Sequence, residues 1–443
     1  MAPLFVRALT LAALSVASSR AAYCGGAPDP NAQPNAYPIE KGAPVFSHSV
    51  ANGHAFVAGP PGAEFRVMHL YGSAYVRARR GARGPRGGAR AAAPPASSLP
   101  PSCSHRCFRA RARSARSQEM GFAHGALYPA DAREMLNRTW NYMVEQVEEG
   151  LAFLPTWLTE IIGNVALDVA LDVLIDLTTP STGPYIYEEL HGLADGAGLD
   201  YKMLARVHLI GELTQGDCSL IGAWGAATAG SKTLQLRALD WDTSGPFRDY
   251  PAMFVYHPTT PGAHDFVTVG MLGFIGAFTG QSSAQMGVSE IGVSFPDTTY
   301  FGNESFSGVP FVFALRDILE FDRSYADSVA RLQNANRTCD LILAVADGKA
   351  QTARSFAVSA SEIFVFDDTN LQPWNNSANT WHPRFKNMVW HAMDWLCPGA
   401  SLASDLFFWR RRGFVDYASP PHLCDPLPPC SLIQATPSPW RRS

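Results

Sequence analysis

The sequence has little of what would mark a membrane, nucleic-acid or metal protein. After residue 22, no stretch is long and apolar enough for a transmembrane helix. The formal net charge is only −4, and outside residues 76–118 the chain has 24 basic against 39 acidic residues, which gives no support to nucleic-acid binding. Cys103 and Cys107 flank His105, but no second ligand pair follows at zinc spacing. We therefore expect no metal, no cofactor and no nucleic-acid partner.

The N-terminal residues have the pattern of a secretory signal peptide. Arg7 precedes a short apolar run, 8–16, and small residues follow, so cleavage is expected between Ser19 and Ala22. The acidic body of the chain fits an acidic or extracellular compartment. We expect residues 1–21 to be removed and the product to reach a lysosomal or phagosomal lumen or the outside of the cell.

Two further features agree with the secretory route. Four sequons can accept N-linked glycans, at Asn137, Asn303, Asn336 and Asn375. In an oxidising compartment most of the eight cysteines are expected to form disulfides, with Cys218 as the exception.

Residues 76–118 do not resemble the rest of the chain. They contain 11 Arg, no Lys and no acidic residue, a composition that predicts disorder. Removing them joins Tyr75 to Glu119 and restores a regular glycine pattern, so our hypothesis is that they are a translated intron. The alternative is a basic loop that binds a membrane or a polyanion. The Pro- and Arg-rich tail, 399–443, is also divergent.

The rest of the sequence predicts a mixed α+β protein with a large hydrophobic core. Helices are expected at 131–149 and 156–177 in an N-terminal helical segment, 23–217, with one short strand at 64–70. Strands dominate the second segment, 218–398, interrupted by helices at 311–321 and 325–334. Strands interrupted by a helical pair suit two sheets between helix layers.

The stretch most informative for chemistry begins at Cys218. Two strand-like runs, 218–228 and 234–242, flank a segment with turn composition. Folding the chain at residues 230–231 brings Cys218 opposite the Asp240 end of the second strand, so that a thiol, a guanidinium and a carboxylate share one sheet edge.

This set suits N-terminal nucleophile catalysis. Cutting the Asp217–Cys218 bond gives Cys218 its own α-amine, whose pKa of about 8 lets it accept the thiol proton. Arg237 can hold a thiolate or a carbonyl, and Asp240 can orient the ammonium group. Side chains at i and i+3 of a straight strand point to opposite faces, so the two converge only near a strand end or bulge. The alternative is a buried structural cysteine beside a surface Arg–Asp pair.

Three motifs point to one family. The first is Cys218-Ser219, a hairpin and Arg237-x-x-Asp240 before an aromatic residue. The second, 189–196, reads Glu-Leu-x-Gly-x-Ala-x-Gly, and the third, 287–296, reads Gly-x-x-x-x-Gly-x-Ser-Phe-Pro. Together they resemble the acid ceramidase, N-acylethanolamine acid amidase and bile salt hydrolase group and the related penicillin acyltransferase group. The likeness is greatest to acid-ceramidase-like proteins of amoebae and protists.

The resemblance implies an Ntn-hydrolase αββα fold, with Cys218, Arg237 and Asp240 as catalytic residues. It implies cleavage before Cys218 into two chains, and hydrolysis of a lipid-like N-acyl amide such as a ceramide. The family has Asn where this chain has Ser294, and Asn379 is another candidate oxyanion donor. The apolar run 271–278 is expected either to line an acyl pocket or to be a buried strand.

Several alternatives stay open. Within the enzyme class they are a small amide or peptide substrate, phospholipase B-like ester hydrolysis, and acyl transfer. From another class, the chain is a catalytically silent lumenal lipid-binding protein. Transient contact with a membrane surface is expected for a lipid substrate.

Overall fold

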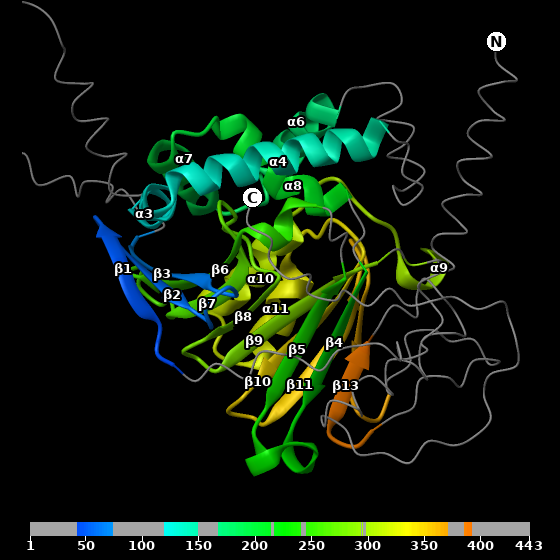
Figure 1. Cartoon of the computed structure of the whole chain (residues 1–443). Coiled ribbons are helices and arrows are strands. Elements are labelled where there is room, and N and C mark those ends of the chain that lie inside the picture. The colour runs from blue at the N-terminus through cyan, green and yellow to red at the C-terminus, as the bar shows by residue number, and fades with distance from the viewer. Residues whose placement is uncertain are drawn as a thin grey trace, which may run out of the picture.

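In the computed structural model, the described residues are 42–73, 119–148, 167–213, 217–240, 245–293, 295, 298–370 and 385–391. They form a mixed α+β fold with one ten-stranded sheet, one three-stranded sheet and helices. Figure 1 shows most of the N-terminal helices gathered at one end of the two sheets. The predicted signal peptide, 1–21, the Arg-rich stretch 76–118 and the tail 399–443 lie outside the described residues.

The large sheet has the order β1-β2-β3-β6-β7-β8-β9-β10-β11-β12. Neighbouring strands are antiparallel except β3 and β6, which are parallel. All seven residues of β10 are buried, as expected of a central strand covered on both faces. The strands are β1 (Val45–Val50), β2 (Gly53–Ala58), β3 (Phe65–Gly72), β6 (Pro251–Pro258), β7 (Phe266–Met271), β8 (Thr279–Ser282), β9 (Met286–Gly292), β10 (Leu341–Asp347), β11 (Thr352–Val358) and β12 (Ile363–Phe366).

The small sheet has the order β13-β4-β5, with β13 (Met388–His391), β4 (Asp217–Ala223) and β5 (Leu234–Asp240). It packs on β9 and β11 of the large sheet. The apolar cluster between the sheets includes Leu220, Ile342, Ala344 and Val389, all with no exposed surface. Burial of this cluster fixes the small sheet, and with it Cys218, against the large one.

The helices pack on the large sheet and on one another, with α10 against β9 and α11 against β10. They are α3 (Glu119–Leu127), α4 (Pro129–Glu148), α6 (Leu167–Thr178), α7 (Pro184–Ala197), α8 (Tyr201–Leu213), α9 (Thr298–Phe301), α10 (Phe311–Phe321) and α11 (Tyr325–Asn334). None of the helices in the described part of the chain is long and apolar enough to cross a membrane.

Glycines bring α3 and α7 into close contact. A Cβ atom at Gly121 would lie 2.0 Å from the carbonyl oxygen of Glu189, and one at Gly196 would lie 2.3 Å from that of Phe122. Real Cβ atoms do not approach a backbone oxygen so closely, so any side chain at these positions would push the helices apart. The glycine motif at 189–196 is therefore a helix-packing motif in this structure.

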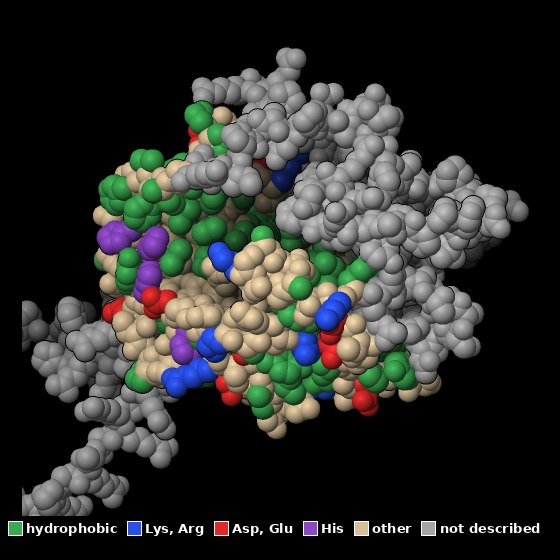
Figure 2. Space-filling view, turned by 90° about the horizontal axis from the view of Figure 1, so that it is seen from below, with side chains coloured by type: hydrophobic (Ala, Val, Ile, Leu, Met, Phe, Trp, Pro, Cys, Tyr) green, Lys and Arg blue, Asp and Glu red, His purple; other side chains and the backbone are tan. Residues whose placement is uncertain are grey.

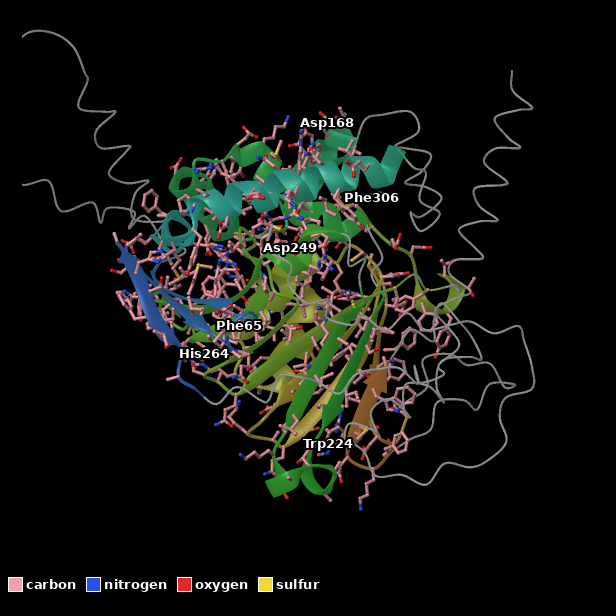
Figure 3. All side chains as sticks on the ribbon, viewed as in Figure 1. Phe65, Asp168, Trp224, Asp249, His264 and Phe306 are labelled. Carbon is pink, nitrogen blue, oxygen red and sulfur yellow. The ribbon has the colours of Figure 1, made fainter. Side chains whose placement is uncertain are left out.

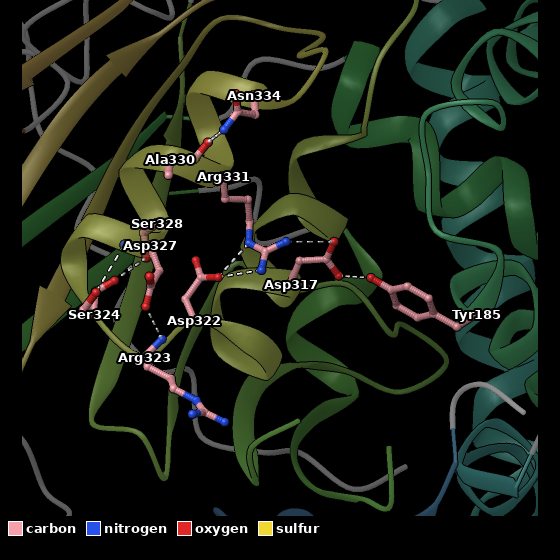
Figure 4. Close-up of polar contacts among 10 residues, drawn as sticks. All are labelled: Tyr185, Asp317, Asp322, Arg323, Ser324, Asp327, Ser328, Ala330, Arg331 and Asn334. Carbon is pink, nitrogen blue, oxygen red and sulfur yellow. Dashed lines mark hydrogen bonds and ion pairs between the residues drawn. The ribbon is translucent and has the colours of Figure 1, made fainter. Parts of the chain in front are cut away.

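A polar network joins α7, α10 and α11 (Figure 4). The hydroxyl of Tyr185 donates to Asp317, and Arg331 pairs with Asp322 at 2.5 Å and with Asp317 at 3.8 Å. The Ser324 hydroxyl caps α11 by accepting from the Asp327 N–H. These contacts fix the helices that back the large sheet.

Most elements of the second segment were predictable, and the helices expected at 311–321 and 325–334 are confirmed. The N-terminal segment differs from expectation, because it contributes three strands, β1–β3, to the large sheet instead of one isolated strand. The hairpin also differs: its centre lies near Thr228, and two short 3-10 turns, η1 (Gly225–Ala227) and η2 (Ala229–Ser231), fill the connection. Of the helix expected at 156–177, the described part begins at Leu167.

The acidic residues that recur every four positions along α6 form an acidic stripe that is only partly solvated. Asp172 forms an ion pair with Arg206 of α8 at 2.7 Å. Asp168, at the outer side of the helical layer (Figure 3), lies 3.5 Å from the same guanidinium. Val169 and Val173 of the same helix are 45% and 52% exposed. The stripe therefore ties α6 to α8 and leaves two valines in contact with solvent.

Candidate active site

The β4–β5 hairpin sets the geometry around Cys218. Cys218 is opposite Leu239, and Leu220 is opposite Arg237. Because side chains alternate along a strand, Cys218 and Leu220 point to the same face, and Arg237 points there too. Figure 3 shows Trp224 at the far end of this hairpin, so the thiol lies at the end nearer the helices.

The guanidinium of Arg237 contacts the thiol directly. Its Nη2 donates to Cys218 Sγ at 3.3 Å. Its Nε donates to the backbone oxygen of Glu290 at 2.8 Å, and its Nη2 forms a short ion pair with the Glu290 carboxylate. The side chains of Arg237 and Glu290 are only 7% and 3% exposed, so this cation is held at two points in a buried setting.

Glu290 was not predicted as a site residue. It lies on β9, far from the hairpin in sequence, inside the motif 287–296. Burial raises the pKa of its carboxyl, and the positive charge of Arg237 works in the opposite direction. The available signal was an acidic residue within an apolar strand, which is rarely buried without a partner.

The residues predicted for cleavage and for binding the ammonium group, Asp217 and Asp240, are placed by their backbones. Asp217 is opposite Asp240 at the end of the hairpin. The side chains of both lie outside the described part of the chain, as do Ser294 and Asn379. Among the side chains that the structure describes, the carboxylate that pairs with Arg237 is that of Glu290.

Cys218 and Arg237 line a cavity of about 100 Å³. Cys218 is only 1% exposed, whereas Leu239, also in the wall, is 47% exposed, so the wall reaches the molecular surface on that side. The other lining residues are Met135, Leu136, Thr139, Val207, Ile210, Gly211, Phe247, Met271, Leu272, Gly273, Phe274, Phe278, Glu290, Gly292 and Phe311. An apolar cavity with one thiol and one ion pair suits an apolar substrate with a single reactive polar group.

The run 271–278 was expected either to line an acyl pocket or to be a buried strand. Five of its residues line the cavity, and only Met271 belongs to a strand, β7. The pocket interpretation therefore describes its position better than the strand interpretation.

A row of histidines lies elsewhere on the large sheet. His54 and His69 are cross-strand partners, His69 Nδ1 lies 3.0 Å from His257 Nε2, and His257 Nδ1 lies 2.9 Å from Asp265. Figure 2 shows histidines grouped beside acidic side chains on one face of the molecule. None of these residues lines the cavity that holds Cys218.

The structure also describes three of the four predicted glycosylation sites and the predicted disulfide residue Cys339. Asn137, Asn303 and Asn336 are exposed, so these sequons are accessible, while Asn375 lies outside the described residues. Cys339 was expected to form a disulfide, but it is present as a thiol beside Glu212, and its burial raises the pKa of the thiol. Among the described residues there is no group of three or more His, Cys, Asp or Glu side chains able to hold a metal ion.

Comparison with known proteins gives relatives in a social amoeba. No model of a protein family matches the sequence. The chain is 31% identical over 359 residues to protein dcd1B of Dictyostelium discoideum, covering 80% of this chain and 62% of that protein. It is 28% identical over 381 residues to protein dcd1A of the same organism, covering 83% and 74%. The chain thus spans less than two thirds of the length of dcd1B.

Two solved structures also resemble parts of the chain. One is the N-acylethanolamine-hydrolyzing acid amidase ortholog of Caenorhabditis elegans, at 16% identity and a TM-score of 0.28 over 40% of this chain and 69% of that one. The other is a C2A mutant of the conjugated bile acid hydrolase of Clostridium perfringens, at 13% identity and a TM-score of 0.19 over 34% and 43%. TM-scores of this size do not establish a common fold.

Proposed function

We propose that this protein is an Ntn-type cysteine amidohydrolase that cleaves N-acyl amides with a fatty acyl chain. The observation that carries the proposal is the hydrogen bond from Arg237 to the Cys218 thiol in the wall of an apolar cavity. A thiol beside a cation that cannot lose its charge is biased toward the nucleophilic thiolate. The two stacked sheets and the helices on the large sheet are compatible with an αββα sandwich.

Activation is proposed to be autoproteolytic. Cys218 Sγ attacks the carbonyl carbon of Asp217, the C–N bond of the Asp217–Cys218 peptide breaks, and the nitrogen leaves as the α-amine of Cys218. Water then hydrolyses the resulting thioester and releases the Asp217 carboxylate. The hairpin register supports this step, because β4 begins at Asp217 and the Asp217–Cys218 bond therefore lies at the end of the hairpin.

Turnover is proposed to repeat the same chemistry on the substrate. The α-amine accepts the thiol proton, the thiolate attacks the amide carbonyl, and the amine product leaves with that proton. Water hydrolyses the thioester and regenerates the thiol. Arg237 steadies the thiolate and is itself held by Glu290, and Asp240 is proposed to orient the new ammonium group.

The compartment and the membrane contact are part of this proposal. Exposed sequons at Asn137 and Asn303 support a lumenal or extracellular location. The exposed Val169 and Val173 of α6 support transient contact with a membrane surface that holds a lipid substrate.

N-terminal sequencing of the protein made through the secretory route tests the proposal. The mature protein should contain two chains, the second beginning at Cys218. Cys218→Ala should remain a single inactive chain, whereas the control Cys339→Ala should be cut and active. A single intact wild-type chain that hydrolyses N-acyl amides would defeat the autoproteolytic mechanism.

A further inference from the structure

The segment between β7 and β8 forms one wall of the cavity and is held by two buried histidines. The N–H of Gly273 donates to His124 Nε2 at 3.0 Å, and the N–H of Ile275 donates to His208 Nε2 at 3.0 Å. Buried N–H groups outside a strand ladder need such acceptors, and leaving one unpaired is costly. Backbone hydrogen bonds from Leu272 to Tyr250 and from Ala277 to Val312 hold the same segment. The two imidazoles add the contacts that hold the part of the wall between them.

Both histidines must be neutral to serve as acceptors. A backbone N–H can only donate, so each Nε2 has to carry a lone pair. His208 Nδ1 lies 2.8 Å from the carbonyl oxygen of Leu204, which can only accept, so the proton of His208 is on Nδ1. Protonating either imidazole would place two donors face to face and remove the anchor of the wall.

The charges around these rings also favour the neutral form. Burial lowers the pKa of His124 to about 3 and that of His208 to about 4. Arg316 of α10, paired with Glu189 at 2.6 Å, adds repulsion to both, and His208 adds repulsion to His124. The wall is therefore anchored at neutral and mildly acidic pH and loses its anchor below about pH 4.

A stack of rings connects His208 to the thiol. His208 stacks on Phe274 with ring centroids 4.6 Å apart and planes 6° apart. Phe274 stacks on Phe278 at 4.8 Å and 7°. The Cζ of Arg237 lies 5.6 Å from the centre of the Phe278 ring, and Arg237 contacts Cys218. The rings thus form one side of the place that the guanidinium occupies.

We propose that His208 and His124 are positioning residues of the site: as neutral hydrogen-bond acceptors they fix the cavity wall, and through Phe274 and Phe278 they hold Arg237 against Cys218. The proposal rests on the amidohydrolase function for its kinetic readout. It predicts that the acid limit of activity is set by loss of this wall when these imidazoles are protonated.

Two substitutions at His208 separate the effect of its hydrogen-bond acceptor from the effect of its stacked ring. His208→Gln keeps an oxygen near the place of Nε2 and cannot titrate, whereas His208→Phe keeps the stacked ring and removes the acceptor. His191 stacks on Tyr201 at 3.6 Å without lining the cavity, so His191→Gln is the matched control. The full chain is used, and melting temperature is measured for every variant.

With a fluorogenic N-acyl amide, wild type and His191→Gln should lose kcat reversibly below about pH 4. His208→Gln should keep its rate at pH 3.5 about tenfold better, relative to its own rate at pH 5.5. His208→Phe should lose about tenfold in kcat at pH 5.5, with KM less affected. The proposal is overturned if the kcat of His208→Gln falls at acid pH in the same way as that of wild type. It is also overturned if His208→Phe has the kcat of wild type at pH 5.5. If His208→Phe does not fold, the acid limb of His208→Gln decides.

A second readout does not depend on amide hydrolysis. The rate of Cys218 alkylation by iodoacetamide at pH 5.5 reports how Arg237 holds the thiol, and it should fall about tenfold in His208→Phe and remain unchanged in His191→Gln. If wild type hydrolyses no amide, the proposed function fails, and equal alkylation rates in wild type and His208→Phe then overturn the positioning proposal separately.

Discussion

Arg237 donates a hydrogen bond from Nη2 to Cys218 Sγ across the hairpin, over 3.3 Å. The same guanidinium is paired with the buried carboxylate of Glu290. The carboxylate of Glu290, the guanidinium of Arg237 and the thiol of Cys218 lie in that order. A substitution at Glu290 should therefore affect Cys218 through Arg237.

Arg237→Lys should fold and lose most turnover. A lysine ammonium has no planar fork, so it cannot hold Glu290 and Cys218 as Arg237 does. Losing a hydrogen bond to a charged group costs roughly 1.5–3 kcal/mol, or about ten- to a hundredfold in rate if the effect falls on the transition state. Acyl-amide hydrolysis and melting temperature, measured together, separate this effect from misfolding. Full activity in this variant would show that the contact of Arg237 with Cys218 has no catalytic role.

Glu290→Gln should lower activity and stability together. The substitution leaves the buried Arg237 cation without its ionic partner, a change that typically costs on the order of 3 kcal/mol. The control Glu362→Gln, at an exposed glutamate, should change neither. A Glu290→Gln protein as stable and active as wild type would contradict the assigned role.

Asp240→Asn should affect turnover without affecting folding, since its proposed partner, the ammonium group of Cys218, exists only after cleavage.

Asp340 should make the protein more stable as the pH falls from about 7 toward 4. Burial raises the pKa of its carboxyl from 3.8 to about 7, so the folded state binds this proton more tightly than the unfolded state. That stabilisation is complete below the unfolded pKa and is lost as the pH rises through about 7. His208, with its lowered pKa, acts in the opposite direction over a similar range, since its stabilisation is lost as the pH falls through about 4.

Asp340→Asn isolates the carboxyl contribution, because the amide oxygen can still accept from the Phe295 N–H at 2.9 Å. Urea unfolding at pH 4.5 and 7.5 should show a pH dependence reduced by on the order of 2 kcal/mol in this variant. An unchanged pH dependence would mean that Asp340 is already ionised in the folded protein at pH 4.5.

Transcript sequencing across Tyr75 and Glu119 should reveal mRNA without the codons for residues 76–118. The reason is the restored glycine pattern and the abrupt loss of acidic residues in this stretch. Gly121, just after the junction, packs against Glu189, so the sequence that resumes there belongs to the packed core. Finding the stretch in every mature transcript would favour the basic loop instead.

The sequence was most informative where structure is local. The hairpin, and with it the meeting of Cys218 and Arg237, follows from two strand patterns separated by a turn. Glu290 could not be found in this way, because its contact with Arg237 joins residues 53 positions apart through the packing of two sheets.

The same limit applies to the N-terminal segment. Three strands in a mostly helical stretch were not expected, because β3 is stabilised by pairing with β6, about 190 residues later in the chain. The glycine motif at 189–196 was interpreted as a family signal, and the close approach of α3 and α7 explains it as helix packing.

The parallel pairing of β3 with β6 has a consequence for a protein cut before Cys218. The two pieces would share a continuous hydrogen-bonded ladder, from Arg66 opposite Ala252 to Gly72 opposite Pro258. They would also share the buried ion pair of Glu189 with Arg316. Such pieces form an obligate heterodimer: the N-terminal piece cannot diffuse away like a released propeptide, and its dissociation is the same event as unfolding.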